Sequence, residues 1–407
     1  MEVHPEFTLS FVEFDDQGRF WNREQIDLLE RTLDEENRRS DTDGVSIIFF
    51  AHGWRHDANV CDLNVACFRT FLQQVYGNAV AVARVSEGRI RPKRTVAIYV
   101  SWRGLSTKLP LSTLSFWARK KVAHRIASGD LMELLTRVEL FVRRANRTDP
   151  DRARLAVVGH SFGGTMVFAA LANLLEMRVL EAMESRDGSD PQGGLIPGFG
   201  SLVVLLNPAF EALAFAPLHE AAERFGRFSP RQLPVLVIVA SETDGPNAMW
   251  FRLGREVDTL FQSTGQHSPR REIVTAVGNY QPFWTHRLTA KEPAQVHPAK
   301  DVFGAHSGPC ACKLPVSGVG DGEARELVAL FDGRTGRTAA SPGEPVPYGR
   351  ATLTPVKKLD PRNPFWVVRA SDEVIHGHSG IFTDPLLDFV RGLIVSASAA
   401  RRVPPAQ

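Results

Sequence analysis

Six short apolar segments constrain the fold of this chain more than any other feature. Continuous apolar runs of this length are typical of strands buried on both faces of a parallel sheet. Amphipathic helices are predicted between some of them, at Asn64–Val75, Leu131–Arg144 and Thr165–Met183. Alternating strands and helices predict an α/β fold in which helices flank a mostly parallel central sheet. The six apolar segments are Ser46–Ala51, Thr95–Ser101, Leu155–Val158, Ser201–Leu206, Pro234–Ala240 and Trp366–Val368.

The regular alternation stops after Asp244. About 120 residues, far more than an ordinary connection, separate Asp244 from the last apolar segment. The later part of this stretch is rich in glycine and proline, which favour turns over regular elements. A strand-like segment and a final helix, Pro385 to Val395, follow it. We therefore predict a core at residues 1–244, a cap or insertion at 245–364, and the end of the core with a C-terminal tail at 365–407.

The composition excludes several classes of protein. The 407 residues carry a formal net charge of +2, and nucleic-acid binding requires clustered positive charge, so no nucleic-acid partner is expected. The sequence contains no run of about 18 apolar residues, so no transmembrane helix is expected. The first residues are acidic and do not resemble a signal peptide. No feature of the sequence indicates the oligomeric state.

The cysteines predict a reduced protein without a metal. Cys61, Cys67, Cys310 and Cys312 are too few to cross-link a chain of this size, so we expect free thiols and a cytoplasmic location. His306 joins Cys310 and Cys312 in one cluster, but a zinc site needs about four ligands. The sequence contains neither the P-loop motif G-x-x-x-x-G-K-[ST] nor the dinucleotide-binding motif G-x-G-x-x-G. No metal or cofactor is therefore expected.

A candidate nucleophile lies where the third apolar segment ends. Leu155–Val158 leads directly into Gly159-His160-Ser161-Phe162-Gly163, and a predicted helix follows. A serine at such a strand-to-helix turn adopts a strained conformation that projects its Oγ from the sheet. The flanking glycines allow the strand and the helix to approach closely. The alternative interpretation is a glycine-rich turn with an incidental serine.

This motif resembles the nucleophile elbow of the α/β-hydrolase superfamily of serine esterases and lipases. Ile47–Trp54 is similar to the superfamily's strand that ends in H-G-x, and Tyr99–Trp102 resembles a strand of bacterial relatives. The resemblance covers roughly residues 45–245 and 365–392. It implies an α/β-hydrolase fold with a large cap or loop insertion before the last strand.

The same resemblance implies an oxyanion hole and roles for two histidines. Its donors would be the backbone amides of Trp54 and Phe162. His52 would organise the oxyanion loop by hydrogen bonding. His160 would pack or form a hydrogen bond beneath the turn.

The acid of a Ser-His-acid triad follows the serine in this superfamily. Asp244 is the leading candidate, because it lies in the turn that leaves the apolar segment Pro234–Ala240. Glu242 and Glu211 are the alternatives. Asp244 could instead cap a following helix.

The base is expected on the loop between the last strand and the last helix. His376 and His378 both lie there, and we favour His378 because Gly377 and Gly380 flank it. Asp372 is near both in sequence and could be a hydrogen-bond partner.

These residues together predict a serine hydrolase that cleaves a small carboxylic ester through an acyl-enzyme. The alternatives are an amidase or peptidase with the same triad, and a non-catalytic binding module. Leu109–Lys121 is interpreted as a helix packed on the sheet, with a lid as the alternative. Large apolar residues of the insertion could line a substrate pocket or form its core: Trp250, Phe251, Phe261, Phe283 and Trp284.

Overall fold

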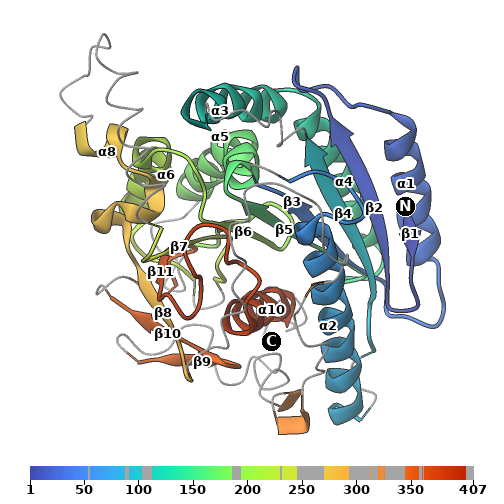
Figure 1. The fold of residues 1–407 in the computed structure, drawn as a ribbon. Helices are drawn as coiled ribbons and strands as arrows, with labels where there is room; N and C mark the ends of the chain where they lie inside the picture. The colour runs from blue at the N-terminus through green and yellow to red at the C-terminus, as the bar shows by residue number, and fades with distance from the viewer. Residues whose placement is uncertain are drawn as a thin grey trace.

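The computed structural model confirms the α/β class, with one 11-stranded sheet at the centre of the molecule (Figure 1). It describes residues 1–53, 56–87, 91–102, 112–185, 194–229, 232–244, 270–292, 312, 320–322, 324–325, 344–356, 360 and 362–399. The strand order is β1-β2-β4-β3-β5-β6-β7-β11-β8-β10-β9. The strands are β1 (Glu2–Val3), β2 (Phe7–Phe14), β3 (Val45–Ala51), β4 (Arg94–Trp102), β5 (Ala153–His160), β6 (Leu202–Leu206), β7 (Leu236–Ser241), β8 (His286–Ala290), β9 (Val346–Tyr348), β10 (Ala351–Pro355) and β11 (Phe365–Ala370).

The sheet is mostly parallel. Every neighbouring pair from β2 across to β8 is parallel, while β1 at one edge and β10 and β9 at the other pair antiparallel. All six apolar segments of the sequence lie on strands of the parallel part. Their continuous apolar runs are explained by burial on both faces, since β4, β6, β7 and β11 are buried at every residue.

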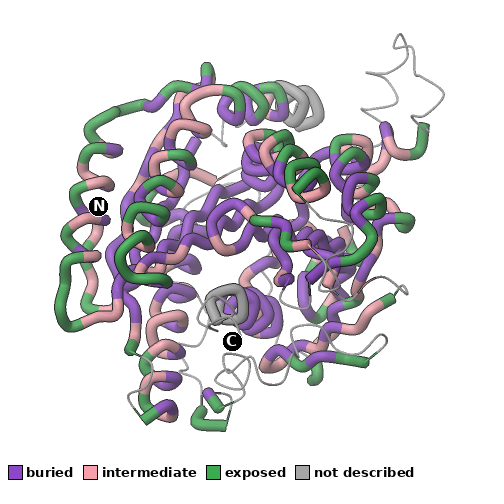
Figure 2. The backbone as a smooth tube through the Cα atoms, turned by 180° about the vertical axis from the view of Figure 1, so that it is seen from behind, coloured by how far each residue is buried: buried purple, intermediate pink, exposed green. Residues whose placement is uncertain are grey.

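Helices cover both faces of the sheet. Apolar residues of α1, α3, α4, α5 and α6 pack against one face, and those of α2 and α10 pack against the other. Figure 2 shows the buried strands between helices whose outer sides are exposed. The helices are α1 (Glu24–Asn37), α2 (Leu63–Val85), α3 (Ser112–Ser128), α4 (Asp130–Ala145), α5 (Phe162–Glu184), α6 (Ala212–Phe225), α8 (Arg270–Val274) and α10 (Asp384–Ala399), with 3₁₀ turns η1 (Val277–Asn279) and η2 (Gln281–Phe283).

The stretch between β7 and β11 contributes to the central sheet. β8 pairs in parallel with β11, and β10 and β9 then extend the same edge. The sequence pattern predicts no strands in these segments and indicates only a cap or insertion at residues 245–364. Their positions near and at the sheet edge explain the difference, because partly exposed strands lack a continuous apolar run. The predicted domain boundaries themselves stay a prediction.

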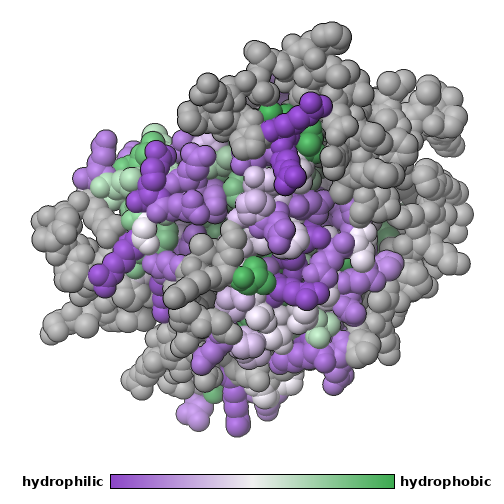
Figure 3. Space-filling view, turned by 90° about the vertical axis from the view of Figure 1, so that its left-hand side faces the viewer, coloured by the Kyte–Doolittle hydropathy of each residue, from purple (hydrophilic) through white to green (hydrophobic). Residues whose placement is uncertain are grey.

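The face of the molecule in Figure 3 is mainly hydrophilic where the structure describes it. On the face shown in Figure 3, hydrophobic side chains occur only in small groups among hydrophilic ones. Among the helices that the structure describes, none combines the length and the hydropathy that crossing a bilayer requires.

Candidate active site

Ser161 lies between the end of β5 and the first residue of α5. Its backbone has φ 55° and ψ −119°, a region that non-glycine residues rarely occupy. Backbone hydrogen bonds hold it there: its N–H donates to the Leu206 carbonyl oxygen at 2.9 Å, and its carbonyl accepts from the Thr165 N–H at 3.0 Å and the Ala209 N–H at 3.3 Å. The predicted strand–serine–helix turn is therefore present, and its strain is concentrated at the serine.

Two glycines make this turn sterically feasible. A Cβ at Gly163 would lie 2.1 Å from the Ala51 carbonyl oxygen, and a Cβ at Gly159 would lie 2.8 Å from the Gly163 carbonyl oxygen. Both are contacts with backbone atoms, which cannot move aside as a flexible side chain can. The glycines therefore allow α5 to start directly against the ends of β3 and β5.

The structure brings Ser161, His378 and Asp244 together from three separate parts of the chain. His378 Nε2 lies 2.7 Å from Ser161 Oγ, and His378 Nδ1 lies 2.8 Å from Asp244 Oδ2. Because a carboxylate only accepts, Nδ1 must carry the proton, which leaves Nε2 to accept the proton of the Ser161 hydroxyl. Asp244 follows β7 and His378 follows β11, so all three residues lie at the carboxyl edge of the parallel strands.

The alternative acids and the alternative base have other partners. Glu242 forms an ion pair with Arg287 at 3.1 Å, and Glu211 forms one with Lys120. His376 Nδ1 lies 3.0 Å from Asp372 Oδ2, with its side chain 57% exposed. The geometry thus selects Asp244 and His378 from the candidates, while their catalytic roles stay predictions.

The loop after β3 lies directly against Ser161. A Cβ at Gly53 would be 2.9 Å from Ser161 Cβ, so no side chain fits between this loop and the serine. Of the two predicted oxyanion donors, Phe162 is the first residue of α5, and its backbone N–H belongs to the positive end of the helix dipole. Trp54 lies outside the described residues.

His52 is a buried, neutral hydrogen-bonding residue. Its Nδ1–H donates to the Gly53 carbonyl oxygen at 2.7 Å, and its Nε2 accepts from the Trp102 backbone N–H at 3.3 Å. Complete burial lowers the pKa of His52 from 6.5 to about 4, because the charged ring would lose its hydration. These contacts join the loop after β3 to the end of β4, which agrees with the organising role that the resemblance implies.

Asn207 and Thr243 belong to the site, although sequence reasoning did not select them. Asn207 Nδ2 donates to the His378 carbonyl oxygen at 2.8 Å. Thr243 Oγ1 donates to Asp372 Oδ1 at 2.5 Å and accepts from the Gly377 N–H at 3.0 Å. The available signal was their position, since each is a polar residue just past the end of an apolar strand.

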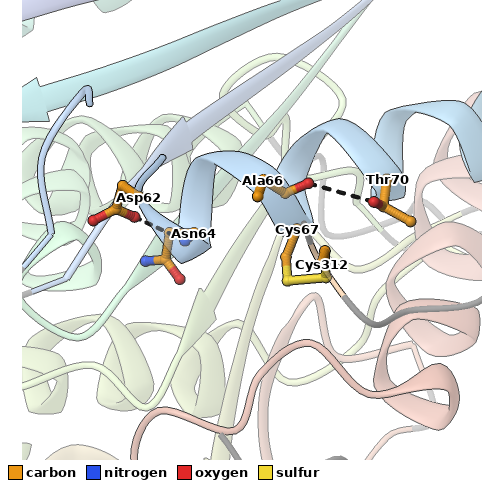
Figure 4. Close-up of a disulfide and its surroundings, with 6 residues drawn as sticks. All are labelled: Asp62, Asn64, Ala66, Cys67, Thr70 and Cys312. Atoms are coloured by element: carbon orange, nitrogen blue, oxygen red, sulfur yellow. Dashed lines mark hydrogen bonds between the residues drawn. A yellow bond between two sulfur atoms is a disulfide. The ribbon is translucent and has the colours of Figure 1, made fainter. Parts of the chain in front are cut away.

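Three disulfide-bonded cysteines correct the expectation of free thiols. Cys67 on α2 and Cys312 form a disulfide across 245 positions of sequence (Figure 4), and Cys61 is disulfide-bonded as well. His306 and Cys310 lie outside the described residues. Because the bonded residues are so distant in sequence, only the folded chain brings them together.

The aromatic residues of the predicted insertion that can be placed belong to the core. Phe283 is buried against Phe215 of α6, and Trp284 packs against the same apolar cluster. Trp250, Phe251 and Phe261 lie outside the described residues. Leu109–Leu111 do so too, but the rest of the predicted segment lies on α3, where Lys120 is buried.

No metal-binding cluster of three or more His, Cys, Asp or Glu residues occurs in the part of the chain that the structure describes. Comparison with known proteins found no match among protein-family models, curated proteins or solved structures. The function must therefore be inferred from the geometry of the site.

Proposed function

We propose that this protein is a serine hydrolase of the α/β-hydrolase type that cleaves a carboxylic ester. The observation that carries the proposal is the hydrogen-bonded series Asp244–His378–Ser161, with 2.8 Å and 2.7 Å between the bonded atoms. Both distances suit proton transfer from a serine to an imidazole that a carboxylate orients. The strained backbone of Ser161, held between β5 and α5, further supports a nucleophilic role.

In the proposed reaction Ser161 Oγ attacks the ester carbonyl carbon while His378 Nε2 takes its proton. Asp244 holds the imidazole in the required tautomer and stabilises the imidazolium that forms. The Phe162 N–H, at the start of α5, is proposed to stabilise the developing oxyanion, as is the Trp54 N–H. His378 then protonates the leaving alcohol, and a water activated by His378 releases the acid and regenerates Ser161.

Ester turnover and active-site labelling test this function. Wild-type protein should hydrolyse a p-nitrophenyl ester and react with a fluorophosphonate probe, and Ser161→Ala should lose both activities by at least about 1000-fold. Ser128→Ala is the matched control, because Ser128 is an exposed serine at the end of α3. It should react like the wild type.

Three outcomes would overturn the proposal or change its class. Equal turnover by wild type and Ser161→Ala would contradict it. Folded wild-type protein that takes up no probe would indicate a binding module without an activated serine. Cleavage of a p-nitroanilide as efficiently as of the ester would indicate an amidase.

The predicted cytoplasmic location loses its main support, which was a set of free thiols. Disulfides persist in oxidising compartments and are rare in the reducing cytoplasm. With Cys61 and Cys67 both disulfide-bonded, we propose that the enzyme works in an oxidising environment. Peptide mapping of protein from the native source, alkylated before cell lysis, would test this, because free Cys67 would contradict it.

A further inference from the structure

Two side chains donate hydrogen bonds to the backbone carbonyl oxygen of His378. Asn207 Nδ2 lies 2.8 Å from this oxygen, and His160 Nε2 lies 3.0 Å from it. Asn207 Nδ2 also lies 3.1 Å from the Gly377 carbonyl oxygen. The backbone of the candidate base is therefore held by the last residue of β5 and by the residue that follows β6.

Asn207 connects this loop to the strand that leads to Asp244. Its Oδ1 accepts from the Ser241 N–H at 2.8 Å, and Ser241 is the last residue of β7. Its own N–H donates to the Val239 carbonyl oxygen at 2.8 Å, and the residue is only 4% exposed. The preceding residue, Leu206, accepts the Ser161 N–H. The end of β6 thus contacts the backbones of the segments that carry all three candidate triad residues.

His160 reaches the same oxygen from beside the nucleophile. Because its Nε2 faces a carbonyl oxygen, that nitrogen must carry the ring proton. The ring is 2% exposed, and burial, together with repulsion from His378, holds its pKa well below 6.5. His160 is therefore a neutral donor that links the residue before Ser161 to the base.

The loop that carries His378 needs such anchoring. Gly377 has φ +59°, and a Cβ built there would contact nothing within 4 Å, so the space beside this residue is open. The side chain of His376, the residue before Gly377, is mostly exposed. A displacement of about 1 Å at a reacting group can lower a rate by about 100-fold.

We propose that Asn207 is a positioning residue, assisted by His160, which fixes the carbonyl of His378 and thereby aligns its ring with Ser161 and Asp244. This inference rests on the proposed function. It predicts a role in turnover rather than in substrate binding, because both side chains bind the backbone carbonyl of the candidate base.

Two substitutions of similar size test the role of Asn207. Asn207→Asp can still accept from Ser241 but presents an oxygen to two carbonyl oxygens, and Asn207→Leu removes the hydrogen bonds without adding charge. Each should lower kcat for the p-nitrophenyl ester by about 10- to 100-fold with KM within about threefold. The rate of fluorophosphonate labelling should fall by a similar factor.

Asn146→Asp is the matched control. Asn146 also donates to a carbonyl and accepts from an N–H, both of Ala153, but it does so at the opposite end of β5. This variant should keep wild-type kcat. Thermal melting of all variants separates misplacement from unfolding. If the Asn207 variants do not melt cooperatively, His160→Phe tests the same carbonyl, and its kcat should also fall at least about 10-fold.

The possible results separate this inference from the proposed function. Wild-type protein that neither labels nor turns over ester would refute the function. Wild-type protein that labels, with folded Asn207→Asp and Asn207→Leu labelling equally fast, would refute the positioning role alone. A slow Asp variant beside a Leu variant of wild-type rate would assign the effect to charge and also refute it.

Discussion

At the scale of single residues, the elbow around Ser161 depends on missing side-chain atoms as much as on those present. A Cβ built at Gly53, Gly159 or Gly163 would lie within 3 Å of a neighbouring atom. Gly53 faces Ser161 and His160, whereas Gly163 faces the backbone of β3. Ser161 can therefore lie against the loop after β3 only while these positions stay glycine.

Gly163→Ala should destabilise the fold or displace the elbow. Its Cβ would lie 2.1 Å from the Ala51 carbonyl oxygen, and relieving a contact of this kind typically costs about 1–3 kcal/mol or more. Gly320→Ala is the control, since its Cβ would meet nothing within 4 Å. Urea unfolding should give a lower midpoint for the first variant only. A Gly163→Ala protein with wild-type midpoint and wild-type labelling of Ser161 would contradict the close approach of β3.

At the scale of elements, the site forms because parallel strands end at one edge. The segments that follow β5, β6, β7 and β11 supply Ser161, Asn207, Asp244 and His378. This edge could be predicted from the sequence, because fully buried strands give continuous apolar runs and Ser161 lies within a recognisable motif. Which side chains of these loops would contact one another could not be predicted. Whether Asp244 or Glu242 reaches His378 depends on the ion pair between Glu242 and Arg287 of β8, a strand that the pattern did not predict.

The cysteines show the same limit between elements. Cys67 lies on α2, one turn after the Asp62 side chain caps the helix by accepting the Asn64 N–H at 2.8 Å (Figure 4). This helix cap is a local feature that can be predicted from three consecutive residues. The bond to Cys312 closes a loop of 245 positions, and no local pattern encodes it.

Removing this disulfide should destabilise the protein. Loss of a native disulfide that closes a long loop typically costs about 2–5 kcal/mol, because the unfolded chain gains freedom. The double variant Cys67→Ser/Cys312→Ser should therefore unfold at a lower guanidinium concentration than the wild type without reductant. Dithiothreitol should destabilise the wild type by more than the variant. Equal midpoints for both proteins under oxidising conditions would contradict a stabilising role of this bond.

At the scale of the whole molecule, buried neutral histidines make folding sensitive to acid. His52 is fully buried and His160 nearly so, and burial is the largest cause that lowers the pKa of each. In the unfolded chain a histidine titrates near 6.5. Between pH 6.5 and about 4, the unfolded protein therefore binds more protons than the folded protein, so the free energy of unfolding decreases as the pH falls.

The expected slope is at most about 1.4 kcal/mol per pH unit for each such histidine. Urea unfolding between pH 6.5 and 5 measures it in a range where ordinary carboxyl groups contribute little. Above pH 6.5 the contribution of these histidines is fully present and should no longer change. His52→Gln should lower this slope by up to the contribution of one proton, whatever the substitution does to the absolute stability.

A wild-type stability that is constant from pH 6.5 to 5 would mean that His52 and His160 accept protons in the folded state. In that case the hydrogen bond from the Trp102 N–H to His52 Nε2 could not persist, because a protonated ring has no acceptor nitrogen.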